Sequence, residues 1–152
     1  MKAARGVYVL WLEAWGEVVI GRLGRWPLAG TYAYVGSARG PGGFRRLERH
    51  RRVAEGRSST RRWHIDYLLT AGQWRGAFVR ETEDPAAECA LARALAEHLP
   101  PAIPHFGSSD CRCPTHLFAV PDPEGFLQLL AAQGLRAFPE REDAGVRSAR
   151  IR

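Results

Sequence analysis

The chain has 152 residues, of which 45% are hydrophobic, and its formal net charge is +6. A chain of this length and apolar content can bury the core of one globular domain without support from disulfides or a metal. No apolar run approaches the ~20 residues that span a bilayer, and the N-terminus leads into an alternating pattern unlike a signal-peptide core. Three cysteines cannot form a paired disulfide framework. We therefore expect a single cytoplasmic domain without membrane contact.

The positive charge is concentrated in one segment. Nine arginines lie between Arg39 and Arg62 against Glu48 and Glu55, so this segment carries +7 and the rest of the chain −1. Such a block is typical of contact with a phosphate backbone, because each neutralised phosphate releases counterions. The alternative is a solvated helix face in an arginine-biased chain. We expect a nucleic acid as the partner, with phosphate contacts from Arg39, Arg45, Arg49, Arg52, Arg61 and Arg62.

The first part of the chain predicts three antiparallel strands. Residues 7–13 and 18–23 are rich in Val, Ile, Trp and Leu, and residues 14–17 between them predict a hairpin turn. Residues 30–37 predict the third strand. Its period of two places Tyr32 and Tyr34 on one face and Ala33 and Val35 on the other.

The remainder predicts helices on this sheet. A glycine-rich turn at residues 40–43 ends the third strand, and Asp84-Pro85 supplies an N-cap and first turn for the most strongly periodic helix. The helical segments are 44–55, 63–69, 86–99 and 124–133, and the further strands are 75–81 and 115–120. We therefore predict an α+β fold, a small antiparallel sheet flanked by helices, over residues 1–138. Residues 139–152 lack any apolar period and predict a flexible tail.

The helix over residues 44–55 carries the first candidate site residues. Arg46 and His50 are four residues apart, so they lie on one helix face at the rim of the core. Arg46 suits a bidentate contact to a phosphoryl oxygen that gains negative charge. His50 can move a proton or fix a tyrosine. Tyr8 or Tyr34 can act as a base only if an arginine or a metal favours its ionised form, and otherwise positions water.

Glu88 is the candidate metal ligand. It lies one turn into the helix over residues 86–99, next to the apolar face. A single carboxylate suffices for Mg²⁺ or Mn²⁺, because such an ion keeps several waters and takes phosphate oxygens as further ligands. The alternative is an ordinary first-turn glutamate that complements the helix dipole.

A second set of ligand-type residues lies near the C-terminal end. Cys111, Cys113 and His116 form a Cys-x-Cys-x-x-His cluster, and Cys89 could complete a Cys₃His zinc site. The alternative is a set of buried free thiols with a histidine that lines the active cleft. A structural zinc ion is therefore one of two open interpretations.

Two short motifs place these residues in a recognisable order. Gly6-Val7-Tyr8 and Tyr34-Val35-Gly36 are followed by Arg46, His50 and Glu88. This order resembles the GIY-YIG nuclease superfamily over residues 6–90. The resemblance implies a small antiparallel sheet flanked by helices and metal-dependent phosphodiester hydrolysis. It implies that Tyr8 and Tyr34 are the motif tyrosines, Arg46 the helix arginine, His50 its partner and Glu88 the metal-binding glutamate.

Three features depart from that pattern. Valine replaces isoleucine in both motifs, which exchanges one β-branched residue for another. The tyrosines are 26 positions apart, with an apparent extra strand between them, whereas the family joins them by a tight hairpin. The chain also contains no asparagine, although family members carry one after the glutamate helix. The candidates for its role are His64, Ser108, Ser109 and Asp110.

The segment around these candidates resembles a less characterised branch of the superfamily. Its members share a Gly-Ser-Ser-Asp-Cys sequence, which stands here at residues 107–111. This resemblance adds Ser108 and Ser109 to the expected nucleic-acid contacts. The sequence thus predicts a Mg²⁺-dependent endonuclease that acts on DNA, with RNA not excluded because arginines read phosphates and not bases. The alternatives are a non-cleaving nucleic-acid-binding module on the same fold and a zinc-stabilised interaction protein.

Overall fold

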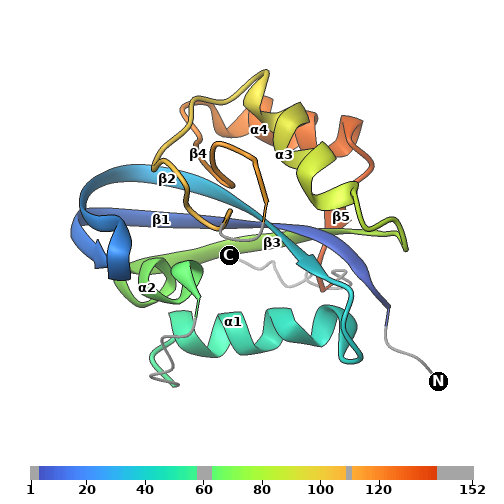
Figure 1. Ribbon diagram of the computed structural model, residues 1–152, viewed down its shortest axis with the longest axis horizontal. Helices are drawn as coiled ribbons and strands as arrows, with labels where there is room; N and C mark the ends of the chain where they lie inside the picture. Colours follow the sequence, from blue (N-terminus) through green and yellow to red (C-terminus); the bar gives the residue numbers. More distant parts are fainter. Residues whose placement is uncertain (1–3, 58–62, 109–110, 140–152) are drawn as a thin grey trace, which may run out of the picture.

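The computed structural model describes residues 4–57, 63–108 and 111–139. In this part of the chain five strands form one antiparallel sheet in the order β4-β2-β1-β3-β5. Helices cover both faces of the sheet (Figure 1). The predicted α+β class is confirmed. Within the described residues no helix is long and apolar enough to cross a membrane.

The centre of the sheet is a single long hairpin. Strand β1 (Gly6–Ile20) and strand β2 (Gly24–Ala38) pair along their whole lengths, and the 3-10 turn η1 (Gly21–Leu23) joins them. The predicted turn at residues 14–17 is therefore wrong. Gly16 adopts a positive φ of 98° but stays in the ladder opposite Leu28. The apparent extra strand at residues 18–23 is the end of β1 followed by η1, so the two motif tyrosines do lie on one hairpin.

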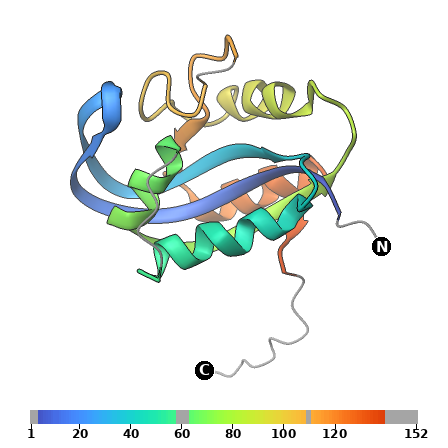
Figure 2. The same cartoon turned by 60° about the horizontal axis from the view of Figure 1, so that its bottom comes forward.

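The other elements pack on this hairpin or extend it. Helix α1 follows the short 3-10 turn η2, and it covers one face of the sheet together with α2 (Figures 1 and 2). Helices α3 and α4 cover the opposite face. The two-residue strand β5 had no sequence signal. The bounds are η2 (Gly43–Arg45), α1 (Arg46–Ala54), α2 (His64–Ala71), β3 (Gly72–Glu81), α3 (Ala87–Ala96), β4 (Leu117–Ala119), α4 (Pro123–Ala132) and β5 (Arg136–Ala137).

The alternation of side chains along β1 and β2 creates two cores. Tyr8 and Leu10 belong to the core under α1 and α2, whereas Val7 and Val9 belong to the core under α3 and α4. The same period in β2 separates its tyrosines from Ala33 and Val35, as the sequence predicts. Tyr8 and Tyr34 therefore share the face that carries α1.

One edge of β2 is only partly covered by a strand. Strand β4 pairs with residues 32–34 of β2, and beyond it the Val35 N–H donates to the His116 carbonyl at 2.9 Å. The segment that leads into β4 thus closes this edge. Helix α3 begins on the sheet face opposite α1 and α2. Glu88 in its first turn lies at the end of β2 that carries Val35.

Candidate active site

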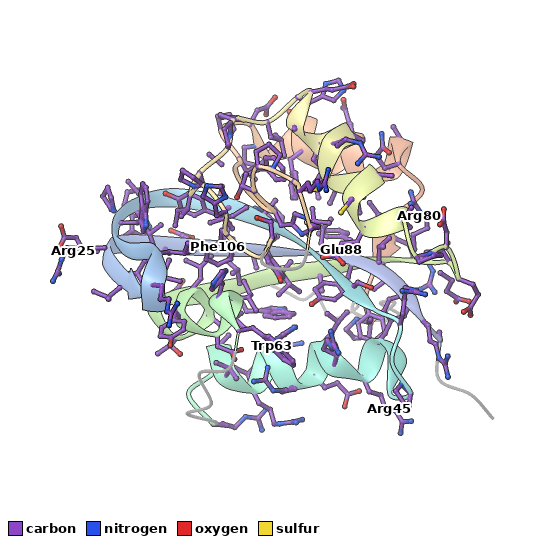
Figure 3. The ribbon with its side chains drawn as sticks, in the orientation of Figure 1. Arg25, Arg45, Trp63, Arg80, Glu88 and Phe106 are labelled. Carbon is purple, nitrogen blue, oxygen red and sulfur yellow. The ribbon has the colours of Figure 1, made fainter. Side chains whose placement is uncertain are left out.

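A cleft of about 420 Å³ opens between the layers on the side of α1 and α2. It brings together residues from β1, β2, α1, α2, α3 and the segment before β4. All five residues predicted as catalytic lie in its wall. In Figure 3 the labelled Trp63 comes from the side of α1 and α2, and Glu88 from the side of α3. The lining residues are Tyr8, Tyr34, Ser37, Arg39, Gly40, Arg46, His50, Trp63, His64, Ile65, Glu88 and Gly107.

The glycines of both motifs allow close approaches. Tyr8 lies directly opposite Gly36 in the β1–β2 ladder, and its ring packs on the Gly36 backbone. A Cβ at Gly36 would lie 2.4 Å from the Tyr8 hydroxyl oxygen. At Gly6 a Cβ would meet the Arg80 carbonyl oxygen of β3 at 2.1 Å. The two glycines are therefore needed to seat the Tyr8 ring and to pair β1 with β3.

His50 holds the Tyr8 hydroxyl. The Tyr8 oxygen lies 3.0 Å from Nε2 of His50, and Nδ1 of the same ring lies 3.4 Å from the Arg49 guanidinium. Since arginine can only donate, Nδ1 is the acceptor, and the proton of the neutral ring is on Nε2. We infer from these partners that His50 donates to the Tyr8 oxygen. Burial first, and then the charge of Arg49, lower the pKa of His50 to about 4.

Arg46 is fixed at the mouth of the cleft. Its guanidinium donates to the Ser37 carbonyl at 2.8 Å and lies 5.1 Å from the centre of the Trp63 ring. Both contacts hold the charged group in one orientation, with the remaining N–H donors available to the cleft. Burial raises the pKa of Tyr8 above its usual value and outweighs the opposing effect of the Arg46 charge. Burial also raises the pKa of Tyr34, so both phenols are protonated at neutral pH in the protein alone.

Arg49 has an intramolecular partner that the sequence analysis missed. Its guanidinium makes a bidentate pair with Asp66 of α2, with both N–O distances at 3.1 Å, and lies 4.5 Å from the Trp63 ring centre. Asp66 is fully buried and also accepts from the backbone N–H of Trp63 at 2.9 Å. The predicted phosphate contact of Arg49 is therefore not what this geometry favours. Arg49 joins α1 to α2 instead.

Glu88 contacts the predicted zinc cluster through His116. Its Oε2 lies 3.0 Å from Nδ1 of His116, and its side chain is 29% exposed in the wall of the cleft. Nε2 of the same histidine lies 3.4 Å from Sγ of Cys111. The predicted magnesium ligand and the predicted zinc cluster are thus in contact through one imidazole ring.

Of the candidates for the role of the absent asparagine, the structure describes His64 and Ser108. His64 lines the cleft and accepts from the Gly107 N–H through Nδ1 at 2.9 Å. Because Nδ1 is an acceptor, Nε2 of the neutral ring is a donor. Ser108 is buried, lies outside the cleft lining, and its hydroxyl has no hydrogen-bond partner among the described residues. Among the candidates that the structure describes, His64 is the one placed in the cleft.

The predicted phosphate-binding residues differ in their positions. Arg39 lines the cleft, and Arg45 lies at a hollow that also borders Arg46. Arg52 is exposed on α1. Arg39, Arg45 and Arg52 make no ion pair with another described residue. Because Ser108 is buried, its predicted nucleic-acid contact is not supported by its position. The predicted positions Arg61, Arg62, Ser109 and Asp110 and most of the predicted tail lie outside the described residues.

Comparison with known proteins gives one match. A family model with the description "Domain of unknown function DUF123" matches residues 7–137. No curated protein and no solved structure matches the chain. The matched range contains all five predicted catalytic residues and the whole Cys₃His cluster.

Proposed function

The chain belongs to the family of domain of unknown function DUF123, and from its cleft we propose that it is a metal-dependent endonuclease of the GIY-YIG type that acts on DNA. The observation that carries the proposal is the meeting of Tyr8, Tyr34, Arg46, His50 and Glu88 in the wall of one cleft. These residues come from two strands, β1 and β2, and two helices, α1 and α3, which are far apart in the sequence. A phenol, a guanidinium, an imidazole and a carboxylate are the groups that phosphodiester hydrolysis requires.

The cleft has the donors to bind one phosphate. Arg46 is oriented by the Ser37 carbonyl and by Trp63, and Arg39 lies in the same wall. The charge that builds on the phosphoryl oxygens in the transition state is stabilised by fixed donors that need no reorganisation. We assign this role to Arg46, with the Nε2–H of His64 as a second donor.

The residues that act on the water are the two tyrosines. The oxygen of the attacking water forms the new bond to phosphorus as its proton passes to the ionised Tyr8 oxygen. The bond from phosphorus to the sugar oxygen breaks, and the departing sugar oxygen takes a proton from solvent. His50 donates to the Tyr8 oxygen, and the charge of Arg46 opposes the burial that raises the pKa of Tyr8. We therefore assign acceptance of the water proton to Tyr8 and orientation of the water to Tyr34. His50 is a positioning residue that acts through Tyr8.

Glu88 is the residue of the cleft that fits a divalent cation. It is the one carboxylate among the residues that line the cleft, and its Oε1 has no hydrogen-bond partner among the described residues. An oxygen ligand of this kind suits Mg²⁺ or Mn²⁺, which keep waters and take phosphate oxygens as further ligands. Such a cation would neutralise the phosphate and supply the further positive charge that ionisation of Tyr8 requires.

The proposal is tested with a panel of labelled DNAs: single-stranded, duplex, flapped and four-way branched. Each is incubated with purified protein and Mg²⁺, Mn²⁺ or EDTA. We expect cation-dependent cutting of at least one substrate by the wild type and by Tyr67→Phe, whose hydroxyl lies outside the cleft lining, and no cutting by Tyr8→Phe. Retardation of DNA without cutting by any protein would instead support the non-cleaving binding module. Cutting that survives in Tyr8→Phe would contradict the proposed site.

A further inference from the structure

Four soft ligands gather beside the cleft. Cys89 comes from α3, and Cys111, Cys113 and His116 come from the segment that leads into β4. Their nearest ligand atoms all lie within 4.8 Å of one another. The cluster contains all three cysteines of the chain. The fold thus brings residues 89 and 116 together from different elements. It also gathers every thiol of the protein in one cluster.

The arrangement fits a closed tetrahedral site. Zinc–sulfur bonds of about 2.3 Å place the ligands of a tetrahedral site about 3.8 Å apart, which the observed cluster accommodates. Thiolate and imidazole ligands select zinc over magnesium or calcium, which prefer oxygen. Three packed thiols that only filled space would not need an imidazole nitrogen at 3.4 Å from Cys111 Sγ. Cys89 and Cys111 are also half-buried at the rim, so an ion can enter.

The second ring nitrogen of His116 has the partners typical of a zinc-bound histidine. Nε2 faces the thiols, while Nδ1 lies 3.0 Å from Oε2 of Glu88 and 3.2 Å from the Val35 carbonyl. A zinc-bound histidine typically donates its other N–H to a carboxylate or a backbone carbonyl, which fixes the ring. His116 has both acceptors in place, although it is almost fully buried.

We propose that Cys89, Cys111, Cys113 and His116 bind one structural Zn²⁺ ion. The ion fixes the His116 ring, and His116 in turn holds the Glu88 side chain in position through its Nδ1–H. All four ligands come from the protein, so the ion is structural and leaves no position open for a substrate. It joins the first turn of α3 to the segment before β4, which also carries Gly107 of the cleft wall. The inference does not depend on the proposed nuclease activity.

The zinc content of the protein tests the proposal without any DNA. The protein is expressed with a cleavable tag, freed of it, and analysed for metals by mass spectrometry. We expect one zinc per chain in the wild type and in His98→Ala, which removes an exposed histidine, and loss of zinc in Cys113→Ser and His116→Ala. Replacement of zinc by Co²⁺ is expected to give the absorption bands of a tetrahedral thiolate site. A wild type with no stoichiometric zinc after zinc-supplemented growth would overturn the proposal.

A second measurement covers variants that fail to fold. Wild-type protein is treated with a strong chelator while zinc release, thiol reactivity and the thermal midpoint are followed. We expect slow release of one zinc, exposure of three reactive thiols and a lower midpoint, reversed by Zn²⁺ and not by Mg²⁺. In Glu88→Ala we expect folded protein whose zinc affinity is about 10- to 100-fold weaker, because His116 loses its carboxylate. Three thiols that react at once and a midpoint that ignores the chelator would contradict the site, and an unchanged affinity in Glu88→Ala would contradict the link to Glu88.

Discussion

The Tyr8 hydroxyl oxygen lies 3.0 Å from Nε2 of His50, within a wholly buried contact between the first strand and the first helix. His50 lies in the cleft wall but is almost fully buried, so we infer that it acts through Tyr8 and not by a direct contact to phosphate. The sequence left open whether this histidine moves a proton or fixes a tyrosine. The partners of its two nitrogens favour the second role.

This relationship predicts how His50 variants behave. Removal of the donor in His50→Ala is expected to lower kcat by about tenfold, the equivalent of one hydrogen bond of about 1–1.5 kcal/mol, with little change in KM. His50→Gln is expected to recover part of that loss, because its amide can donate to the Tyr8 oxygen. Single-turnover cleavage rates across pH measure the effect. Equal loss in the alanine and glutamine variants, with an unchanged pH profile, would indicate a merely structural histidine.

The same buried histidine predicts a loss of stability in acid. Since the folded pKa of His50 is about 4, below its ordinary value of 6.5, the unfolded chain binds the proton first as the pH falls. The contribution is neutral above about pH 6.5, and by pH 5 the folded state has lost about 2 kcal/mol relative to the unfolded state. Urea unfolding at pH 7 and pH 5 measures it against His50→Gln. A wild type and variant that lose the same free energy between these pH values would contradict the prediction.

The Arg49–Asp66 pair predicts a large stability cost at one arginine of the basic block. The Arg49 side chain is 23% exposed and Asp66 is 0% exposed, so Arg49→Met leaves a carboxylate in the core without its guanidinium. We expect a loss of about 3–5 kcal/mol in the free energy of unfolding. The matched control is Arg51→Met, which breaks the exposed pair with Glu55 and should cost less than about 1 kcal/mol. Similar costs in both variants would refute the assigned role of Arg49.

Gly36 predicts a steric effect on the active cleft. In Gly36→Ala the added methyl meets the Tyr8 ring and displaces it, at a cost of about 1–3 kcal/mol in stability. Cleavage should fall together with it because Tyr8 leaves its contact to His50. Gly42→Ala is the control, since nothing lies within 4 Å of a Cβ there. Thermal unfolding and cleavage rates measure both, and a Gly36→Ala variant with wild-type values would show that the ring is not seated as described.

The exposed arginines near the cleft predict the salt dependence of DNA binding. Arg45→Gln is expected to reduce the slope of log affinity against log salt by about 0.9, the loss of one phosphate contact. Arg25→Gln serves as the control, because Arg25 lies at the opposite end of the molecule from Arg45 (Figure 3). Fluorescence anisotropy at several salt concentrations measures the slopes. An equal change in both variants would mean that binding is not centred on the cleft.

Local patterns in the sequence were sufficient for much of the fold. The alternation of Tyr32 and Tyr34 with Ala33 and Val35 predicted the two faces of β2, because burial on both faces follows the period of the strand. The turn at residues 14–17 was wrong because Gly16 is a turn residue by composition, yet it stays paired in the long ladder. The strand β5 consists of two exposed residues and has no periodicity to detect.

The candidate site, like the fold, could be predicted only in part. The resemblance in motif order selected five residues that the fold brings to one cleft, while their roles stay predictions. The partners that orient them were not predictable, since the Ser37 carbonyl belongs to the backbone and carries no side-chain signal. Asp66 did carry a signal, an acidic residue in an apolar helix. Its partner Arg49 could not be selected from nine arginines without the three-dimensional contact.

The most direct test of the central claim is the rate of metal-dependent DNA cleavage by Glu88→Gln beside wild type, with DNA affinity measured in the same preparations. Glu97→Gln, on an exposed position at the end of the same helix, is the matched control. We predict that Glu88→Gln binds DNA as tightly as wild type and loses cleavage by at least about a hundredfold, whereas Glu97→Gln cuts normally. Cleavage at the wild-type rate by Glu88→Gln would contradict the account.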